Sequence, residues 1–219
     1  MGKVITIDGP AASGKSSVSR ELAQRLSCTW LSTGAFYRGL AYVALQMNIE
    51  LDDVQSISQL SQSPIWKVQM TPARTLVFFR DQDVTNLISH EDVGNFASRI
   101  SHYPDVRKSL LAAQRNCATT ESCLIAEGRD CGTVVFPSAE AKIYLTASSE
   151  HRAARRAAEQ GSSAQEIKES QKVRDQQDAT RKVAPLQIPD GAFVVDASEL
   201  NLSQVVDKIE VYVKQKLVI

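Results

Sequence analysis

Short apolar runs alternate with stretches of helical spacing along most of the chain. The run Val4-Ile5-Thr6-Ile7 has the β-branched composition of a buried strand, and helical spacing of apolar residues follows it from Val18 to Leu26. Four later runs are equally short and apolar, and they cover residues 29–31, 123–126, 142–145 and 192–195. This alternation predicts an α/β fold with a five-stranded parallel sheet flanked by helices.

Residues 64–87 have a different pattern. Apolar and polar residues alternate over 65–70 and over part of 75–80, and 71–74 has the composition of a turn. We therefore predict a small antiparallel β insert outside the main sheet. The last helix has a clear start, because Asn201 can cap it and Gln204 can complete a capping box.

Size and charge narrow the class of protein. A chain of 219 residues can bury one sizeable core, and 43% hydrophobic with 23% charged residues is ordinary for a globular protein. The formal net charge is zero, which argues against a nonspecific nucleic-acid or membrane-surface binder. The sequence has no apolar run of about 18 residues and no secretory leader, so we expect a cytoplasmic protein.

The cysteines form no C-x-x-C pair, so we do not expect a zinc site. In the cytoplasm they should be reduced and partly buried. They are Cys28, Cys117, Cys123 and Cys131.

The first strand runs into a glycine-bounded loop that matches G-x-x-x-x-G-K-[ST], namely Gly9-Pro10-Ala11-Ala12-Ser13-Gly14-Lys15-Ser16. Strand, loop and helix follow in the order that this phosphate-binding motif requires. Backbone N–H groups and the helix dipole would face a triphosphate, Lys15 would reach its β- and γ-phosphates, and the Ser16 hydroxyl would bind Mg²⁺. A turn that merely caps a helix is the weaker alternative. The motif predicts binding of a nucleoside triphosphate.

Two other predicted strands end in residues suited to anions. Thr33, Gly34 and Arg38 come after the second strand, and Arg129 and Asp130 come after the third. Open parallel sheets bind ligands beyond the carboxyl ends of their strands, so these groups should gather with the phosphate loop on one rim. Arg38 falls in the first turn of a helix, where a cation is unfavourable unless it faces an anion.

Arg152, Arg155 and Arg156 share one face of a helix after the fourth strand. We interpret them as a mobile lid over a triphosphate, hinged near residues 161–163, in preference to a solvated basic face.

Arg174, Asp178 and Arg181 share a face of a later helical segment. On spacing alone, exposed helix salt bridges are the better interpretation of this set.

No general-base histidine or nucleophilic triad accompanies these stretches. A nucleoside monophosphate needs neither, because it is already an anionic nucleophile. It needs cations that offset the repulsion between two polyanions. The pattern therefore favours phosphoryl transfer to a phosphate over transfer to an alcohol.

The chain resembles bacterial cytidylate kinases, of the nucleoside monophosphate kinase group, nearly from end to end. The resemblance rests on residues 5–16, on Thr33-Gly34-Ala35-Phe36-Tyr37-Arg38, on residues 127–137 and on Arg174-Asp175-Gln176-Gln177-Asp178 with Arg181 and Pro185-Leu186. It implies a P-loop kinase that phosphorylates CMP and dCMP with ATP and Mg²⁺. We expect these small molecules as partners, no nucleic acid, no membrane, and a monomer.

Roles follow for individual residues. The predicted ATP-binding residues, from the motif and the lid, are Gly9, Pro10, Ala11, Ala12, Ser13, Gly14, Lys15, Ser16, Ser17, Arg152, Arg155 and Arg156. The resemblance implies that Thr33, Ser98, Arg107 and Asp130 lie at or near the cytosine, that Arg38, Arg129 and Arg181 hold the acceptor phosphate, and that Arg174 and Asp178 reach the ribose. Lys15, Arg129, Arg155 and Arg181 are the expected catalytic residues, and Ser16 is the expected metal ligand. The resemblance thus raises a binding role for 174–181 above the salt-bridge interpretation.

The chain accordingly divides into five predicted parts. They are a core with the phosphate loop and the first acceptor-binding part (1–63), the β insert on the acceptor side (64–87), core (88–147), lid (148–165) and core (166–219).

Asp130 could accept a hydrogen bond from the C4 amine of cytosine, and Arg107 could donate to N3 and O2. Uracil presents an acceptor in place of the amine, so this pair would favour CMP by about 1–3 kcal/mol. Three residues depart from the family pattern, namely Ala12 for a glycine, Ser32 for an aspartate and Glu127 for an aspartate. Asp8 is one candidate for the carboxylate that would join Ser16 at Mg²⁺.

Two other functions stay open. One is a nucleotide-dependent switch, although no N-K-x-D-like guanine-reading stretch is present. The other is a kinase for a different small acceptor, which Arg107 and Asp130 would distinguish from a CMP kinase.

Overall fold

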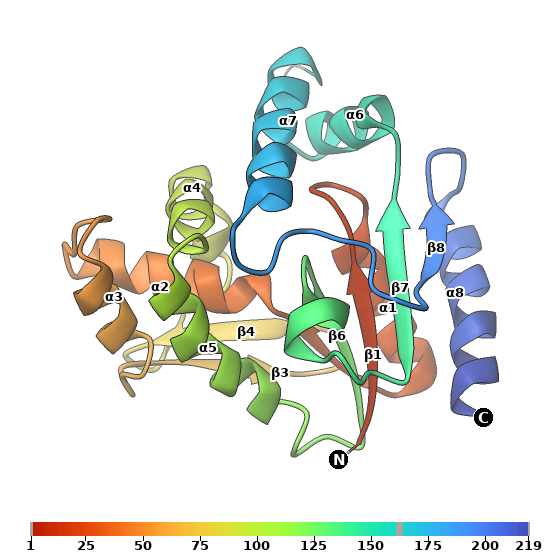
Figure 1. The fold of residues 1–219 in the computed structure, drawn as a ribbon, viewed down its shortest axis with the longest axis horizontal. Helices are drawn as coiled ribbons and strands as arrows, with labels where there is room; N and C mark the ends of the chain where they lie inside the picture. The colour runs from red at the N-terminus through yellow and green to blue at the C-terminus, as the bar shows by residue number, and fades with distance from the viewer. Residues whose placement is uncertain (1, 161–163, 219) are drawn as a thin grey trace.

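The computed structural model describes residues 2–160 and 164–218. Within them, the main sheet has five parallel strands in the order β2-β6-β1-β7-β8 (Figure 1). These strands are β1 (Lys3–Asp8), β2 (Thr29–Ser32), β6 (Cys123–Gly128), β7 (Ala141–Thr146) and β8 (Phe193–Asp196). The predicted fold class is confirmed, and each strand begins and ends within two residues of its predicted bounds.

Helices cover both faces of the sheet. They are α1 (Lys15–Leu26), α2 (Gly34–Gln46), α3 (Val54–Leu60), α4 (Glu91–Ile100), α5 (Pro104–Asn116), α6 (Ser149–Gln160), α7 (Ala164–Thr180) and α8 (Leu202–Leu217). Successive side chains of β1 point to opposite faces, so Val4 packs in the cluster with α2, α4 and α5, whereas Ile5 and Ile7 pack in the cluster with α1 and α8. No helix in the described part of the chain combines the length and apolarity needed to cross a membrane.

The predicted start of α8 is confirmed. The Gln204 backbone N–H donates to Asn201 Oδ1 at 3.0 Å, and the Asn201 backbone N–H donates to Gln204 Oε1 at 3.0 Å. This capping box satisfies two N–H groups that a helix end leaves without partners.

A small antiparallel sheet, β3-β4-β5, lies beside β2 and supports α2. Its strands are β3 (Trp66–Met70), β4 (Thr75–Phe79) and β5 (Gln82–Asp83). Thr75 Oγ1 donates to the Trp30 carbonyl at 3.0 Å and accepts from the Ser32 N–H at 2.8 Å. On α2, a Cβ at Gly39 would come within 3.0 Å of Val77 and 3.1 Å of Trp66. The missing side chain therefore lets the sheet approach the helix that carries Arg38.

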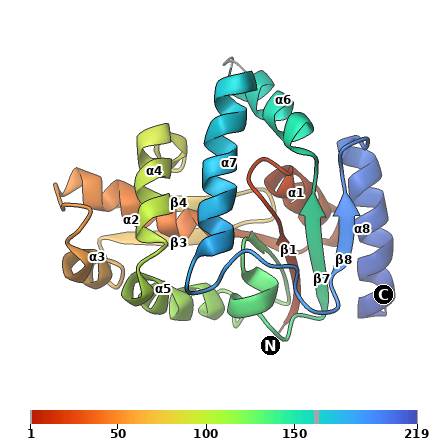
Figure 2. The same cartoon turned by 45° about the horizontal axis from the view of Figure 1, so that its top comes forward.

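Helices α6 and α7 pack against each other beyond the carboxyl ends of β1 and β7 (Figures 1 and 2). They stand at the edge of the sheet where the phosphate loop was predicted, as a lid requires. The predicted hinge at 161–163 lies outside the described residues, and the division of the chain into five parts stays a prediction.

Cys28 and Cys123 form a disulfide, so the prediction of four reduced cysteines is wrong. Cys28 lies directly before β2 and Cys123 is the first residue of β6. Because Thr29 pairs with Leu124 in these parallel neighbours, the two cysteines come to a Cα–Cα distance of 4.7 Å. Cys117 and Cys131 are free thiols. Because the two cysteines are 95 residues apart in the sequence, their pairing could not be predicted before the strand order was known.

Candidate active site

The phosphate loop, residues 9–14, joins β1 to α1 and depends on glycine at both ends. Gly9 has φ +155°, and a Cβ there would lie 2.0 Å from the Leu145 carbonyl oxygen. Gly14 has φ +92° and is the N-cap of α1. Ala12 has φ 55°, a region that side chains disfavour, which gives a physical reason for the glycine common at this position. The loop thus has the close-turning backbone that phosphate binding requires.

The side chain of Lys15, the first residue of α1, reaches back to this loop. Its Nζ donates to the Pro10 carbonyl at 2.6 Å and to Ser13 Oγ at 3.3 Å. Burial, together with the positive charge of Arg129, lowers the pKa of Lys15 to about 7. A phosphate placed beside the ammonium would raise that pKa again, because an opposite charge favours the protonated form.

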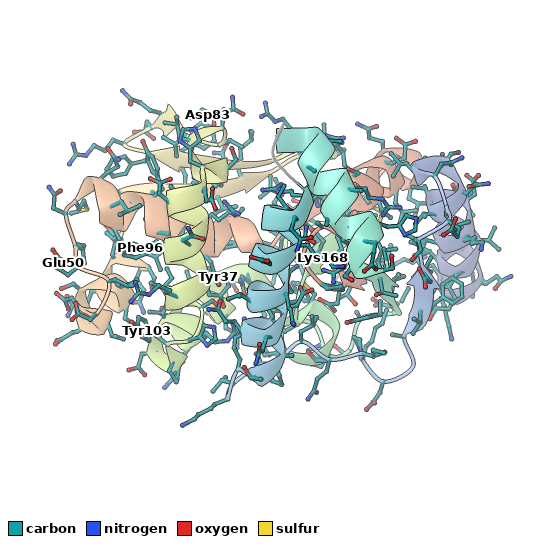
Figure 3. All side chains as sticks on the ribbon, turned by 90° about the horizontal axis from the view of Figure 1, so that it is seen from above. Tyr37, Glu50, Asp83, Phe96, Tyr103 and Lys168 are labelled. Atoms are coloured by element: carbon teal, nitrogen blue, oxygen red, sulfur yellow. A yellow bond between two sulfur atoms is a disulfide. The ribbon has the colours of Figure 1, made fainter. Side chains whose placement is uncertain are left out.

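A cavity of about 280 Å³ opens between the phosphate loop, α2, α4, the end of β6 and α7. Seen from above, Tyr37 lies between α4 and α7 at this cavity (Figure 3). The predicted acceptor residues that line it are Thr33, Arg38, Ser98, Arg129, Asp130, Asp178 and Arg181. We call it the acceptor cleft. Because Lys15 and Ser16 also line it, a ligand in the cleft would face the phosphate loop directly.

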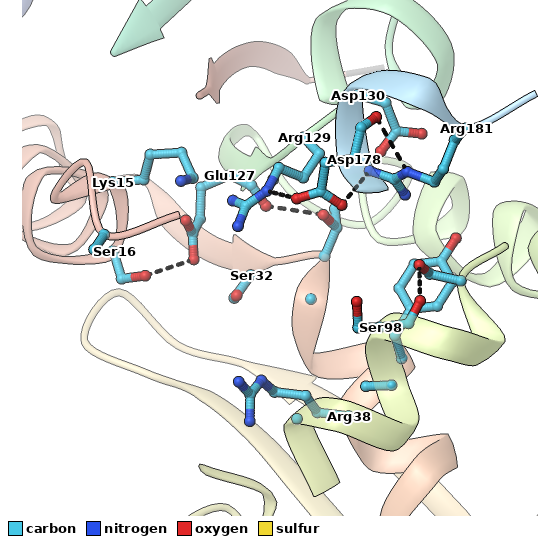
Figure 4. A pocket seen from close by; sticks show the side chains of 18 residues that line it. Lys15, Ser16, Ser32, Arg38, Ser98, Glu127, Arg129, Asp130, Asp178 and Arg181 are labelled. Carbon is cyan, nitrogen blue, oxygen red and sulfur yellow. Dashed lines mark hydrogen bonds and ion pairs between the residues drawn. The ribbon is translucent and has the colours of Figure 1, made fainter. Parts of the chain in front are cut away.

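Two arginines of the cleft share one carboxylate. Arg129 Nε donates to Asp178 Oδ2 at 2.7 Å, and Arg181 Nη2 lies 2.9 Å from Asp178 Oδ1 (Figure 4). A second nitrogen of Arg129 donates to the Gly9 carbonyl at 3.1 Å, next to the phosphate loop. The cleft therefore holds a cluster of cations with a carboxylate between them. The side chain of Arg174, the other predicted ribose residue, lies outside the described part of the structure.

Arg107 and Asp130 form a buried ion pair at the same cleft. Arg107 Cζ lies 5.5 Å from the centre of the Tyr37 ring, which gives the cation an aromatic face as well. Burial raises the pKa of Asp130, and the charges of Arg107 and Arg181 oppose that rise. Ser98 lies at the other wall, where its hydroxyl donates to Gln177 Oε1 at 3.3 Å. Three of the four predicted base-recognition residues, Thr33, Ser98 and Asp130, thus line one cleft, and Arg107 adjoins it through its ion pair with Asp130.

Arg38 enters the cleft from α2. Its Nη1 donates to the Ile88 carbonyl at 2.7 Å, and the guanidinium lies against Gly94 of α4. A Cβ at Gly94 would come within 2.9 Å of Arg38 Nη2. The absence of a side chain at Gly94 therefore leaves room for this cation.

Glu127, rather than Asp8, is the carboxylate beside the predicted metal ligand. Ser16 Oγ donates to Glu127 Oε1 at 2.9 Å (Figure 4). Both Asp8 oxygens instead accept backbone N–H groups, from Cys131 at 2.8 Å and Gly132 at 2.7 Å, and burial raises the Asp8 pKa to about 6. A hydroxyl and one carboxylate beside a phosphate loop fit Mg²⁺, which takes few protein ligands when it is bound with a nucleotide.

A second cavity of about 610 Å³ lies on the other side of the phosphate loop. It is bounded by residues 12–18, by Arg155, Arg156 and Ala158 of α6, and by Ala197 with residues 200–202 and Val205. Arg155 Nη2 donates to the Ala197 carbonyl at 2.5 Å. Its position suits the nucleoside of a triphosphate whose phosphates lie in the loop, and we call it the donor cavity.

Arg152 does not share this cavity with the other two lid arginines. Its side chain is 10% exposed, and its Nη1 donates to the Ala11 carbonyl at 2.9 Å and to Asp175 Oδ2 at 2.6 Å. The predicted common face of three arginines is therefore divided, with Arg155 and Arg156 at the donor cavity and Arg152 against the loop.

Comparison of the whole chain with known proteins identifies its family. The cytidylate kinase family model matches residues 5–215. A cytidylate kinase of Bdellovibrio bacteriovorus is 65% identical over 217 residues, which cover 99% of this chain and 100% of the relative. The chain belongs to the cytidylate kinase family. The resemblance noted from the sequence is thereby confirmed.

The chain is also similar to cytidylate kinases from other organisms. One from Geobacillus sp. (strain WCH70) is 41% identical over 218 residues, with 97% of each chain covered. Among solved structures, a gluconokinase from Sinorhizobium meliloti 1021 has a TM-score of 0.53 at 15% identity, with 99% of this chain and 95% of that chain covered. At that identity the likeness supports the kinase fold alone.

Two features of the site escaped sequence reasoning. The first is the π-helical turn at Cys131–Val135, whose backbone N–H groups bind Asp8. The second is Asp175, which binds Arg152 and the Ala11 N–H. A local pattern could not reveal either feature, because the partners are far apart in the sequence: Asp8 lies more than 100 residues from Cys131 and Gly132, and Asp175 lies 164 residues from Ala11.

Proposed function

We propose that the chain transfers the γ-phosphoryl group of ATP to CMP or dCMP, with ADP and CDP or dCDP as products. The observation that carries the proposal is its membership of the cytidylate kinase family, with 65% identity over nearly the whole chain to one member. The site is consistent with this reaction. The phosphate loop and the arginine cluster face the same cleft, as two polyanions that must react require.

The chemistry needs placement and charge rather than a base. ATP phosphates would lie in the phosphate loop against Lys15, and the CMP phosphate would lie among Arg38, Arg129 and Arg181. An oxygen of the CMP phosphate then forms the new bond to the γ-phosphorus, and the bond from that phosphorus to the β–γ bridging oxygen breaks. The electron pair leaves with ADP. Holding the reactants in line and neutralising their charges supplies most of the acceleration.

On the donor side, we propose that backbone groups from Gly9 to Ser17 hold the triphosphate. Arg155 and Arg156 lie across the donor cavity from this loop, where they can reach the phosphates or the nucleoside. Arg155 is the lid residue that we assign to catalysis, because a cation at this position can stabilise the negative charge that develops on the leaving ADP.

Base recognition would rest on the Arg107–Asp130 pair. We propose that Asp130 accepts from the cytosine amine while Arg107 donates to N3 or O2, with Thr33 and Ser98 nearby. Uracil would place a carbonyl oxygen, an acceptor, opposite the Asp130 carboxylate, which would then lose the hydrogen bond that the cytosine amine donates. The same argument separates this function from a kinase for an acceptor without a cytosine.

Asp178 would change partners when CMP binds. Without ligand it neutralises Arg129 and Arg181. We propose that the acceptor phosphate takes over those two cations, which frees the carboxylate to accept from a ribose hydroxyl beside Arg174.

We propose that Ser16 and Glu127 hold Mg²⁺ together with ATP. The metal would supply charge neutralisation on the phosphates. Ser16 would provide its hydroxyl oxygen, and Glu127, which already accepts from that hydroxyl, would orient it or bind the ion.

We also propose that the enzyme works as a monomer in the cytoplasm, with ATP and CMP or dCMP as its partners. All the residues assigned to donor and acceptor come from one chain, so no second copy is needed to complete the site.

A coupled assay of ADP release tests the function across CMP, dCMP, UMP, AMP and GMP. We expect turnover with CMP and dCMP at rates typical of kinases, about 1–100 s⁻¹, and a lower kcat/KM for UMP. A nucleotide-dependent switch would instead hydrolyse ATP slowly and with no dependence on CMP. Equal activity on all five acceptors would exclude a cytidylate kinase.

A further inference from the structure

One residue of the phosphate loop has both of its backbone groups bound by helices beyond the sheet. The Ala11 N–H donates to Asp175 Oδ1 at 3.0 Å, and the Ala11 carbonyl accepts from Arg152 Nη1 at 2.9 Å. The same Arg152 nitrogen lies 2.6 Å from Asp175 Oδ2. Asp175 comes from α7 and Arg152 from α6, so two helices and one loop residue, Ala11, close a ring of polar contacts.

This ring is well anchored. Arg152 Nε donates to the Ala147 carbonyl at 3.1 Å, and its backbone carbonyl accepts from Gln171 Nε2 at 3.3 Å. The side chains of Arg152 and Asp175 are 10% and 22% exposed. A charged pair so little exposed is screened weakly by salt and holds its geometry better than a surface pair.

The residues on either side of the ring belong to the donor site. Ala12, the next residue, is in the left-handed region at φ 55°, and residues 13–17 of the predicted triphosphate-binding stretch follow it. On α6, Arg155 is one turn after Arg152 and reaches the donor cavity. The ring therefore fixes, at once, the path of the loop and the helix that carries Arg155.

We propose that Asp175, acting through Ala11 and Arg152, is a positioning residue for the ATP phosphates. It holds the phosphate loop and the lid helices in register, and Arg152 serves in this clamp instead of contacting ATP. The inference rests on the proposed function only in taking ATP as the donor. It does not depend on which acceptor follows.

Asp175→Asn is the sharpest test, because it keeps the size of the side chain but removes its charge and places an amide against Arg152. We expect ATP affinity, measured by calorimetry without an acceptor, to fall by about 10-fold, which corresponds to about 1.4 kcal/mol. The KM for CMP should stay within twofold, since the clamp does not touch the acceptor cleft. Arg152→Lys should weaken ATP binding similarly, and the double variant should be little worse than either single one, since both break the same ring.

Lys168→Gln is the matched control. Lys168 Nζ lies 2.7 Å from Glu150 Oε1, so this ion pair also joins α7 to α6. It is more exposed than the Arg152–Asp175 pair, and neither of its bonded atoms contacts the phosphate loop. ATP affinity should be unchanged in that variant. Circular dichroism and thermal unfolding would show that each variant is folded.

Three outcomes would overturn the proposal. They are an ATP affinity of Asp175→Asn within twofold of the parent, a tighter affinity, as expected of a latch that ATP must open, or an equal loss of CMP and ATP binding, as expected of general destabilisation. A failure of the proposed function is seen separately, because the parent protein would then produce no CDP while the calorimetric comparison remains valid.

Discussion

Arg107 and Asp130 form an ion pair in which each side chain is only 8% exposed. Neither charge has much water around it, so each depends on the other and on whatever ligand enters the cleft. Removing one member of a buried pair costs about 3–5 kcal/mol, because it leaves the other charge without compensation. The same pair can therefore serve stability and base selection, and a useful variant must separate these two contributions.

Asp130→Asn keeps the shape of the side chain and avoids the empty space that alanine would leave. We expect the ratio of kcat/KM for CMP over UMP to narrow by about 10-fold or more, because an amide can present its NH₂ group to the uracil O4 oxygen. The ratio is insensitive to a loss of folded enzyme, since both substrates share one sample. Asp81→Asn, at an exposed pair with Lys67, is the control. An unchanged ratio in Asp130→Asn would remove this residue from base recognition.

Gly94→Ala should impair the acceptor site without weakening the fold. The new Cβ would lie 2.9 Å from Arg38 Nη2, so the guanidinium must move, whereas alanine is the better helix former by about 1 kcal/mol. We expect the KM for CMP to rise by about 10-fold, which is about 1.4 kcal/mol, with the ATP KM and the melting temperature unchanged or slightly improved.

The double variant Arg38→Met with Gly94→Ala tests whether Gly94→Ala raises the KM for CMP by displacing Arg38. If Gly94→Ala acts by displacing Arg38, it should add nothing once the guanidinium is gone. Additive losses of CMP affinity would show that Gly94 acts through another contact.

ATP binding should take up a proton above neutral pH. The pKa of Lys15 is about 7 in the free protein, because the side chain is buried. Phosphates would raise that pKa, so between about pH 8 and 9 the free form is largely neutral and the bound form charged, and affinity should fall as pH rises above about 7. The phosphates themselves are already ionised there, since their second pKa is about 6.

Calorimetry in two buffers of different ionisation enthalpy at pH 8 measures this uptake directly. We expect close to one proton per ATP bound, and none for Lys15→Arg, whose guanidinium stays charged. If the parent protein takes up no proton, Lys15 does not change its protonation state when ATP binds.

Local patterns carried most of the fold, because strands and helices depend on residues close in sequence. The run from Val4 to Ile7, the phosphate loop and the Asn201–Gln204 capping box were predictable for this reason. Contacts between residues that come together only once the order of the strands is set could not be predicted in this way. Asp8 meets the backbone of Cys131 and Gly132 because β1 lies beside β6, and Asp175 meets Ala11 because α7 crosses the loop.

The candidate site shows the same division. The motif alone predicts Lys15 and Ser16, and the position after a strand predicts Asp130 at the rim. Arg107 and its partnership with Asp130 come from family resemblance, since their spacing of 23 residues signals nothing. For the Mg²⁺ carboxylate the sequence offers Asp8 only as one candidate, because it does not say which acid at a strand end turns toward the loop. The side chain that reaches Ser16 is Glu127.

The Cys28–Cys123 disulfide should stabilise the protein substantially. It closes a loop of 95 residues, for which the chain-entropy argument gives about 4–5 kcal/mol. We expect Cys28→Ser, or treatment with dithiothreitol, to lower the melting temperature by about 10–15 °C for a chain of this size. Cys117→Ser, at a free thiol, is the matched control.

Thiol titration of the unfolded protein complements the melting curves. The oxidised protein should show two reactive thiols, from Cys117 and Cys131, and the reduced protein four. Four thiols before any reduction, with no change in melting temperature on adding dithiothreitol, would contradict the disulfide.

A crystal structure of the enzyme with CMP tests the central claim most directly. We predict the phosphate among Arg38, Arg129 and Arg181, the cytosine amine on Asp130 and the ring within reach of Arg107. CMP bound with its phosphate away from these arginines, or with its base away from Asp130, would contradict the account.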